Sequence, residues 1–171
     1  MDKLLEVKDL KVSFFTHAGE VKAVGGISYE INHGEIMGIV GESGSGKSVE
    51  AYTIIGLLQS PGKVVGGEIL FDGENVLEYT PEQMEDFRGN KVSMIFQNPM
   101  TCLNPVYSIG NQLSEAILCH QKVEKKEAWD KSIEMLKLVG INNPEYTINL
   151  AASKISSKAA HRYTGNYCKK K

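Results

Sequence analysis

A glycine-rich loop between an apolar run and a helical pattern constrains this chain more than any other feature. Residues 38–58 read GIVGESGSGKSVEAYTIIGLL. The run EIMGIV, at 35–40, is continuously apolar after its first residue, as expected of a strand buried on both faces. After the loop a helix is predicted, ended by SPGK at 60–63, with a broad apolar face that comprises Val49, Ile54, Ile55, Leu57 and Leu58. We therefore expect a strand, a tight loop and a helix in direct succession.

The loop itself, Gly41–Ser48, fits the pattern G-x-x-x-x-G-K-[ST] of phosphate-binding loops. Glycines allow backbone angles that other residues avoid, so successive N–H groups can point inward around an anion, aided by the positive end of the helix dipole. In such loops the lysine, here Lys47, reaches the β- and γ-phosphates, and the hydroxyl of Ser48 binds Mg²⁺. The alternative is a turn that merely contains glycines, but the pattern arises by chance in about one such chain in a hundred. The loop therefore predicts nucleotide binding.

Two other classes of phosphate-loop protein have marks that this chain lacks. A GTPase needs Asp-x-x-Gly after a strand, and DFRG, at 86–89, lies at the end of a predicted helix. It also needs Asn-Lys-x-Asp, and in NKVS, at 90–93, a serine replaces the guanine-reading aspartate. A small-molecule kinase needs a lid with arginines, and the chain has only Arg88 and Arg162. The sequence favours neither class.

Composition indicates a single globular domain made and kept in the cytoplasm. The chain has 171 residues, 42% of them hydrophobic, and its net charge of −2 gives no reason to expect a nucleic-acid partner. No apolar run approaches the roughly 20 residues that cross a bilayer, and MDKLLEVKDL at the start does not predict a signal peptide. Cys102, Cys119 and Cys168 have no metal-type spacing, so we expect a reducing compartment.

The remaining elements follow from periodicity and from helix-start signals. Alternating and apolar runs predict strands at 4–14, 21–31, 67–71 and 91–97, and helical spacing predicts helices at 109–120 and 124–139. Thr80, Pro81 and Gln83 have the arrangement of a helix start with a capping box. Trp129, Ile133 and Leu136 mark the buried face of the last helix. The chain is thus expected to contain both strands and helices.

Two segments together resemble one family. VGESGSGKSV, at 40–49, and MIFQNPMTCLNP, at 94–105, are similar to the ATP-binding subunits of ABC transporters, specifically the oligopeptide and dipeptide importers, in which MTSLNP is usual where this chain has Cys102. GEVKAVGGISYEI, GGEILFDGENV and LNPVYSIGNQLSEAI also resemble that branch, and the resemblance covers about Leu4 to Glu145. It implies an α/β P-loop NTPase fold of the ABC type. We expect an incomplete one within residues 1–145: an antiparallel β subdomain, a partial parallel core sheet and a partial helical subdomain.

The resemblance also implies roles for individual residues. Phe14 corresponds to the aromatic residue that stacks on adenine, with Phe15 as the alternative if the turn length differs. Gln97 corresponds to the glutamine that touches Mg²⁺ and the attacking water, which makes Lys47 and Gln97 the candidate catalytic residues and Ser48 and Gln97 the candidate metal ligands. The candidate nucleotide-binding residues are Phe14, Ser43, Gly44, Ser45, Gly46, Lys47, Ser48 and Val49.

The family further implies two partners and a location. Residues Asn98–Tyr107 correspond to the surface that receives the coupling helix of a transmembrane permease subunit. A second ATP-binding subunit completes the site in the intact family. The resemblance thus implies a peripheral position on the cytoplasmic face of the membrane, with ATP and Mg²⁺ as cofactors. Which peptide is carried is set in other subunits.

Hydrolysis in this family needs residues that the sequence does not contain. These are an aspartate and a glutamate after an apolar strand, an LSGGQ-like turn and a histidine at the γ-phosphate. Asp72 ends the apolar stretch EILF but precedes a glycine turn, and His161 has no supporting context. We therefore expect ATP binding with little or no hydrolysis by this chain alone. The alternative is a non-hydrolysing ATP-binding module, or another P-loop NTPase or kinase.

The charge distribution changes after Glu145. Residues 146–171 carry six basic and no acidic side chains, whereas the rest of the chain carries 13 basic and 21 acidic ones. YTINLAASK, at 146–154, lies near where the family has its LSGGQ-like segment. We expect 146–171 to be an atypical basic tail, weakly structured from Ala151 onward, that arises from truncation or from translation out of frame.

Overall fold

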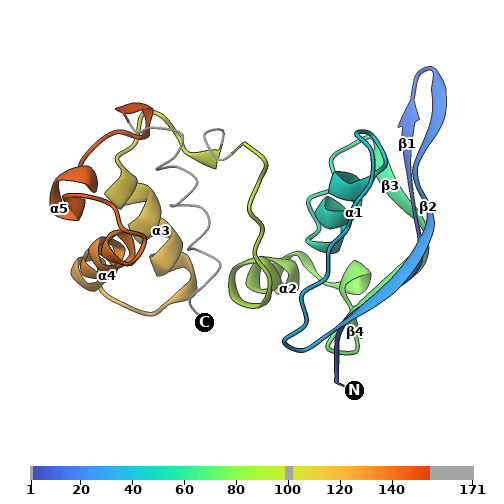
Figure 1. Cartoon of the computed structure of the whole chain (residues 1–171), viewed down its shortest axis with the longest axis horizontal. Helices are drawn as coiled ribbons and strands as arrows, with labels where there is room; N and C mark the ends of the chain where they lie inside the picture. The colour runs from blue at the N-terminus through green and yellow to red at the C-terminus, as the bar shows by residue number, and fades with distance from the viewer. Residues whose placement is uncertain (1, 99–101, 155–171) are drawn as a thin grey trace. The chain divides into compact units, whose positions relative to one another are not determined.

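The computed structural model describes residues 2–98 and 102–154. The chain has two compact units, Met1–Arg88 and Gly89–Lys171, and each is described by itself. The first contains a β-sheet with α1 and α2, and the second contains α3, α4 and α5 (Figure 1). No helix in the two described ranges combines the length and the apolar character that crossing a bilayer requires.

The sheet of the first unit is antiparallel, with the strand order β2-β1-β3-β4. The strands are β1 (Lys3–Thr16), β2 (Gly19–Asn32), β3 (Gly62–Phe71) and β4 (Glu74–Asn75). Turns at 17–18 and 72–73 join consecutive strands, as the alternation and the glycines predict. The antiparallel β subdomain is therefore confirmed.

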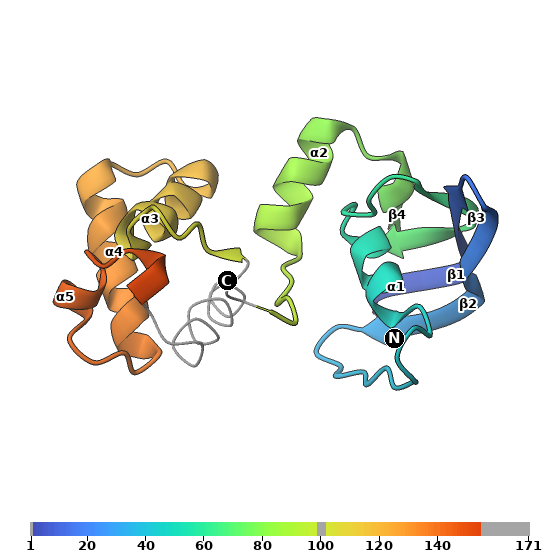
Figure 2. The ribbon, with the colours of Figure 1, turned by 90° about the horizontal axis from the view of Figure 1, so that it is seen from above.

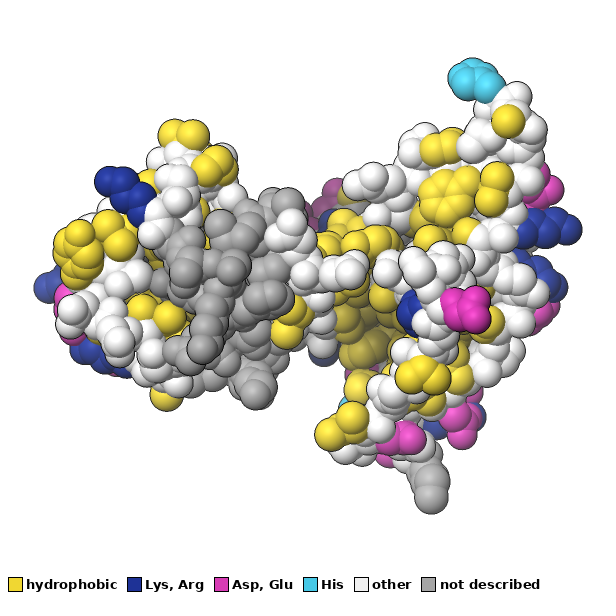
Figure 3. All heavy atoms as spheres, turned by 45° about the horizontal axis from the view of Figure 1, so that its top comes forward, with side chains coloured by type: hydrophobic (Ala, Val, Ile, Leu, Met, Phe, Trp, Pro, Cys, Tyr) yellow, Lys and Arg dark blue, Asp and Glu magenta, His cyan; other side chains and the backbone are white. Residues whose placement is uncertain are grey.

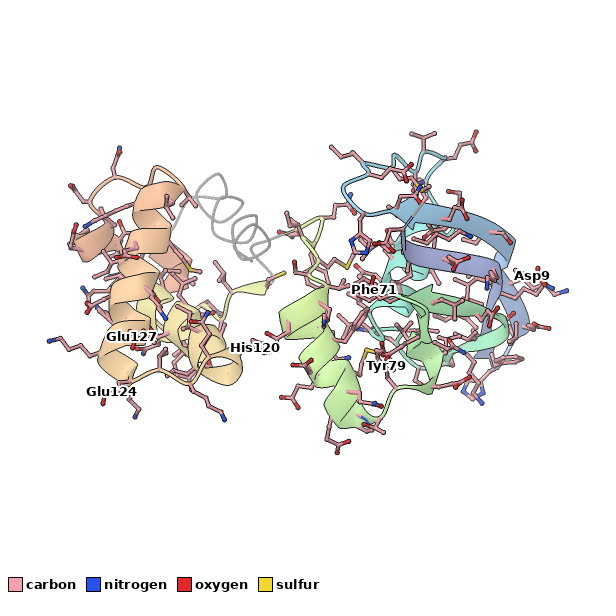
Figure 4. All side chains as sticks on the ribbon, turned by 90° about the horizontal axis from the view of Figure 1, so that it is seen from below. Asp9, Phe71, Tyr79, His120, Glu124 and Glu127 are labelled. Carbon is pink, nitrogen blue, oxygen red and sulfur yellow. The ribbon has the colours of Figure 1, made fainter. Side chains whose placement is uncertain are left out.

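A line of irregularities crosses this sheet at Asp9. Residues with positive φ face one another on three strands: Asp9 at 45°, Gly26 at 99° and Gly67 at 86°. The pairing register of β1 shifts on both sides of this point, and a Cβ on Gly67 would collide with the backbone of Lys8 and Asp9. The backbone of Asp9 also donates to the Ser28 hydroxyl at 2.8 Å (Figure 4 labels Asp9). Only glycine fits the close approach at Gly67.

The core of the first unit combines residues of the sheet with residues of the turns before and after α2. Its most deeply buried apolar residues are Val7, Leu10, Val12, Ile69, Val76 and Phe87. The Phe87 ring meets Phe71 edge-on at a centroid distance of 5.1 Å and Tyr79 at 5.6 Å (Figure 4 labels Phe71 and Tyr79). Phe71 ends β3, Tyr79 follows a 3₁₀ turn (Val76–Glu78), and Phe87 begins a π-helical turn (Phe87–Lys91) directly after α2 (Pro81–Asp86).

The predicted capping box at the start of α2 is confirmed. The Gln83 backbone donates to the Thr80 hydroxyl at 3.3 Å, and the Thr80 backbone donates to the Gln83 side chain at 2.9 Å. This reciprocal pair satisfies two N–H groups that the helix would otherwise leave without partners.

Two predicted strands are not formed. Residues 35–40 are irregular, with Ile36 97% and Val40 93% exposed, and residues 92–97 are irregular as well. A buried parallel strand is stable only when neighbours on both sides take up its N–H and C=O groups. Within 2–98 and 102–154, no strand pairs with either segment, so the prediction of a partial parallel core sheet was wrong for these residues. Hydrophobic side chains consequently lie on the surface of the first unit (Figure 3).

The helix after the loop, α1 (Lys47–Ile54), begins as predicted but ends before SPGK. Gly56 adopts a left-handed φ of 65°, and Leu57 donates back to the Tyr52 carbonyl at 2.8 Å, which closes the helix. The helix packs beside the sheet, where it contacts β2 (Figure 2).

The second unit confirms the two long helices expected from periodicity. These are α3 (Ile109–His120) and α4 (Lys125–Leu138), followed by the short α5 (Pro144–Thr147) and a 3₁₀ turn at Ala152–Lys154. The core comprises Ile109, Leu113, Leu136, Ile148 and Ala152, with Trp129 and Ile133 packed against it. A Cβ on Gly110 would collide with the Trp129 ring, so α3 and α4 approach closely there.

The expectation of weak structure from Ala151 onward was wrong for residues 151–154. Ala151 forms a bridge with Ser108, and Ala152 is buried and donates to the Tyr107 carbonyl at 3.2 Å. Ile148, three residues before Ala151, is fully buried against α3 and α4. Apolar contacts therefore hold this segment despite its polar composition, while residues 155–171 lie outside the described residues. A boundary between 1–145 and 146–171 stays a prediction.

Candidate functional site

The loop at Gly41–Ser48 connects the irregular segment 35–40 to the first turn of α1. Gly44 and Gly46 have φ angles of 84° and 89°, in the left-handed region that favours glycine. Ser45 donates from its backbone to the Glu42 carbonyl at 3.2 Å, which closes a tight turn. The sequence therefore places glycine at the two positions where this turn needs it.

The Lys47 ammonium lies over the loop that precedes it. It donates to the Gly41 carbonyl at 2.7 Å, to the Glu42 carbonyl at 2.6 Å and to the Ser45 hydroxyl at 3.1 Å. A Cβ on Gly41 would lie 2.8 Å from that hydroxyl and 3.6 Å from the ammonium. The backbone of the loop thus holds the positively charged ammonium of Lys47 in place through two carbonyl groups.

The same loop also contains backbone donors. Among the described residues, the N–H groups of Gly44, Gly46, Lys47 and Ser48 have no hydrogen-bond acceptor. The first N–H groups of a helix point along its axis, where they and the dipole favour an anion. A lysine and several free N–H donors at one helix start are the chemistry that a phosphate group requires. The residues present therefore fit a nucleotide phosphate.

The start of α1 is pressed against β2. Gly46 approaches so closely that a Cβ there would collide with the Ala23 carbonyl and lie 3.4 Å from the Val24 side chain. One turn later, Glu50 is only 5% exposed, and burial together with a hydrogen bond to Glu50 raises the pKa of Tyr29 on β2 well above its usual range. Sequence reasoning missed Glu50, because an acidic residue in the first turn of a helix normally lies in solvent.

The two candidate adenine-stacking residues have different surroundings. Phe14 is half-buried, and a Cβ on Gly62 would lie 2.9 Å from both its ring and the Leu58 side chain. Phe15 is exposed, and the Lys63 ammonium lies 5.9 Å from its ring centroid. Phe14 stands two residues after Val12, which pairs with Val24, the residue that Gly46 contacts. Phe14 therefore lies in the part of the sheet that the loop approaches.

The other candidate residues lie in the second unit or outside the site. Gln97 is exposed in an irregular segment of the second unit. Asp72 has a φ of 48° in the turn between β3 and β4 and pairs with His33 at 3.1 Å, so it belongs to a hairpin turn of the antiparallel sheet. His161 lies outside the described residues. In the described ranges, no cluster of three or more His, Cys, Asp or Glu side chains could hold a metal ion.

The Gln112 side chain of α3 forms hydrogen bonds with the segment expected to meet a membrane partner. Gln112 accepts from the Asn104 backbone at 2.8 Å and donates to the Asn104 and Tyr107 carbonyls at 3.0 and 3.2 Å. Val106 and Tyr107 are exposed, while Pro99–Thr101 lie outside the described residues. The sequence did not indicate this role of Gln112, because its side chain donates to and accepts from a loop that is eight residues away in the chain.

The phosphate-binding loop, the antiparallel sheet and the helical unit are together typical of one class of protein, the ATP-binding cassettes. The family model "ABC transporter" matches residues 24–163, and the chain belongs to this family. The match runs past Glu145, so the family resemblance does not stop where the acidic residues do.

The relatives are named as subunits of peptide transporters. The chain is 47% identical to a probable peptide ABC transporter ATP-binding protein of Sinorhizobium fredii, over 86% of this chain and 44% of the relative. It is 45% identical to the oligopeptide transport ATP-binding protein OppD of Bacillus subtilis, over 86% of this chain and 41% of the relative. It is 41% identical to AppD of the same organism, over 96% of this chain and 48% of the relative. The chain thus spans less than half the length of these relatives.

Solved structures confirm the fold. A dimeric ATP-binding cassette in a post-hydrolysis state with bound ADP and Pi aligns with a TM-score of 0.81 at 20% identity, over 96% of this chain and 68% of that one. A second structure of the same cassette, described as dimeric and bacterial, aligns with a TM-score of 0.77 at 21% identity, over 95% of this chain and 70% of that one. The expected ABC-type P-loop fold is therefore confirmed at the level of the family.

Proposed function

We propose that this chain binds ATP with Mg²⁺ through Gly41–Ser48, as the nucleotide-binding part of the ATP-binding subunit of a peptide importer. The observation that carries the proposal is the geometry of the loop: the Lys47 ammonium donates to the Gly41 and Glu42 carbonyls, and the N–H groups at the start of α1 have no acceptor among the described residues. The relatives supply the transport context, since they are named for oligopeptide or dipeptide transport.

Each loop residue has a specific part in this proposal. Lys47 exchanges its contacts with the Gly41 and Glu42 carbonyls for phosphate oxygens, and the N–H groups of Gly44 and Gly46 donate to the same anion. The Ser48 hydroxyl would hold Mg²⁺, which neutralises phosphate charge when bound. Val49 extends the first turn of α1, and Ser43 and Ser45 line the loop with hydroxyls.

Phe14 is proposed as the adenine platform. Its half-buried ring is fixed beside Gly62 and Leu58, and a fixed ring loses little entropy on stacking. Gln97 is proposed to bring water and Mg²⁺ to the γ-phosphate when the second unit takes its place in the intact subunit.

The segment Asn98–Tyr107 is proposed to receive the permease, at the cytoplasmic face of the membrane. Gln112 holds its carboxyl half in one conformation while Val106 and Tyr107 present apolar surface. Pairing with a second ATP-binding subunit is the further partner that the family implies.

The test is a titration of a fluorescent ATP analogue with Mg²⁺ against wild type and Lys47→Ala. Removal of a charge-assisted hydrogen-bond donor costs about 1.5–3 kcal/mol, so Lys47→Ala should weaken binding at least about tenfold. Lys8→Ala is the matched control, because Lys8 is an exposed lysine of the same unit that pairs with Glu68. Equal affinities of wild type and Lys47→Ala would contradict the proposal.

The same titration decides the adenine platform. Stacking of a base on an aromatic ring is worth about 1–3 kcal/mol, so Phe14→Ala should weaken binding about tenfold while Phe14→Tyr binds as wild type does. Phe15→Ala is the control. If Phe15→Ala is the damaging change, the aromatic role belongs to the neighbouring residue.

A phosphate-release assay separates turnover from binding alone. We expect little release by this chain, because the sequence contains no Asp-Glu pair after an apolar strand and no SGG turn. Release comparable to that of a full-length relative would exclude the non-hydrolysing module.

A further inference from the structure

The end of α1 that lies away from the phosphate loop is closed by a tight turn at Gly56. The N–H of Gly56, whose φ is 65°, donates to the Thr53 carbonyl at 3.1 Å. The N–H of Leu57 donates to the Tyr52 carbonyl at 2.8 Å. These two hydrogen bonds form a Schellman motif, which ends a helix at a glycine. The carbonyl of Gly56 takes no part in the motif, so it can accept a donor from another element.

Two side chains from the segment around α2 meet Gly56. The Nη1 atom of Arg88 donates to the Gly56 carbonyl at 3.4 Å. A Cβ added to Gly56 would lie 2.8 Å from the Sδ atom of Met84 and 3.0 Å from its methyl group, so the Met84 side chain lies directly against the glycine. Met84 belongs to α2, and Arg88 belongs to the π-helical turn that follows it. Both residues are half-buried.

The charge of Arg88 suits this position. The last carbonyls of a helix carry a partial negative charge, and a cation near them is stabilising. The last turn of α1 contains no basic residue of its own. The guanidinium of Arg88 therefore supplies a cation that the sequence of α1 lacks, together with a hydrogen bond to the turn that ends the helix.

The helix α1 is thus fixed at both ends, by different elements. At its start, Gly46 lies so close to β2 that a Cβ would collide with the Ala23 carbonyl, and at its end Gly56 lies against α2 and the π-helical turn. A helix of eight residues is only about 12 Å long, so a tilt at one end changes the direction of the other. Residues 36–45, which precede the helix, are all exposed, so packing of that segment does not set the direction of the first turn.

From this arrangement we propose that Arg88, supported by Met84, is a positioning residue that holds α1 in the direction in which its first turn binds phosphate. The inference rests on the proposed function, since it concerns the affinity of the same loop. Arg88 acts through the helix and does not itself touch the nucleotide. When the end of α1 is released, the helix occupies several directions, and the apparent affinity falls with the fraction of molecules that are oriented for binding.

Three variants take the contact apart. Arg88→Ala removes the donor and the charge, Arg88→Lys keeps a charged donor, and Met84→Ala removes the packing against Gly56. Lys91→Ala is the matched control, because Lys91 is an exposed basic residue of the same π-helical turn. The readout is the Kd for the fluorescent ATP analogue with Mg²⁺, beside a urea unfolding curve for each variant, which separates a loss of affinity from a loss of stability.

The expected result is a loss of affinity in folded protein, which a purely structural contact would not produce. Arg88→Ala should weaken binding about fivefold and Met84→Ala about threefold. Arg88→Lys should stay within about twofold of wild type, because an ammonium also stabilises a helix end, and Lys91→Ala should bind as wild type does. The double variant of Arg88 and Met84 should lose less than the product of the two single losses, because both side chains hold one glycine.

Two results would overturn the inference. One is wild-type affinity of folded Arg88→Ala, which would make the contact purely structural even if the unfolding midpoint falls. The other is an equal loss in Lys91→Ala. If Arg88→Ala does not fold, Met84→Ala decides the matter, and wild-type affinity of that variant refutes the positioning role.

The same titrations distinguish this inference from the proposed function. A loss of affinity in Lys47→Ala without a loss in Arg88→Ala refutes the positioning role alone. Equal affinities of wild type and Lys47→Ala would instead refute the proposed function, and the positioning role with it.

Discussion

Two apolar stretches of the first unit whose sequences favour strands, β1 and residues 35–40, differ in burial, and only β1 contributes to the core. In β1, Val7 and Val12 are almost fully enclosed, whereas Ile36 and Val40 are almost fully exposed. The strand β1 pairs with β2 on one side and β3 on the other. Segment 35–40 has no such neighbour among the described residues. Partners for the backbone, more than apolar side chains, thus decide which stretch becomes a strand.

The difference has a consequence for the phosphate loop. In this structure the loop is held from its carboxyl side, through α1 and β2, because the segment before it is exposed. Substitutions in the sheet should therefore affect stability strongly, and matched substitutions in segment 35–40 should affect it little.

The largest expected effect in this comparison is at Gly67. Gly67→Ala adds a Cβ that collides with the backbone of Lys8 and Asp9 at a φ of 86°, so it should lower the free energy of unfolding by about 4 kcal/mol or more. Gly73→Ala, at a φ of 83° with open space around the Cβ, should cost about 1 kcal/mol from backbone strain alone. Gly38→Ala, in the exposed segment, should change stability by less than about 0.5 kcal/mol.

Urea unfolding, with the hydrogen exchange of β1 amides as the readout, measures the free energy of unfolding of all three variants on the same scale. A cost at Gly38 equal to that at Gly67 would show that segment 35–40 is packed as tightly as the sheet.

Two isoleucines provide a second matched pair. Ile69 in β3 is 0% exposed and Ile36 is 97% exposed. Ile69→Ala should cost about 3 kcal/mol, through lost burial and a cavity, whereas Ile36→Ala should cost less than about 0.5 kcal/mol. Thermal unfolding of the two variants beside wild type tests this, and similar midpoints would refute the contrast.

The sequence predicted those elements whose partners are close along the chain. The hairpin β1–β2, the turn at 72–73, the Thr80 capping box and the long helices depend on local signals, and all are present. The loop was predicted from glycine spacing because φ preferences are local. The strands at 35–40 and 91–97 were predicted wrongly, since their burial depends on distant neighbours. Glu50 was missed because its partner, Tyr29, lies on another element.

A smaller effect is expected where the stabilising contact is local. Thr80→Ala removes the capping box of α2 and should cost about 1 kcal/mol. Thr80→Ser keeps a hydroxyl that accepts from the Gln83 backbone and should cost less. Urea unfolding followed by circular dichroism compares the two. A larger loss for Thr80→Ser than for Thr80→Ala would contradict the capping role.

The central claim is that a loop held from one side by the sheet binds the phosphates of ATP. Hydrogen exchange with and without saturating Mg²⁺ and ATP, read by mass spectrometry, tests it most directly because it reports the sheet and the loop at once. In wild type, ATP should slow exchange within Gly41–Ser48, where the N–H groups of Gly44 and Gly46 lack acceptors, at short labelling times at which the paired centre of β1 is still protected. In Lys47→Ala this slowing should be lost. Unchanged exchange at Gly41–Ser48 in wild type, or equal slowing in Lys47→Ala, would contradict the account.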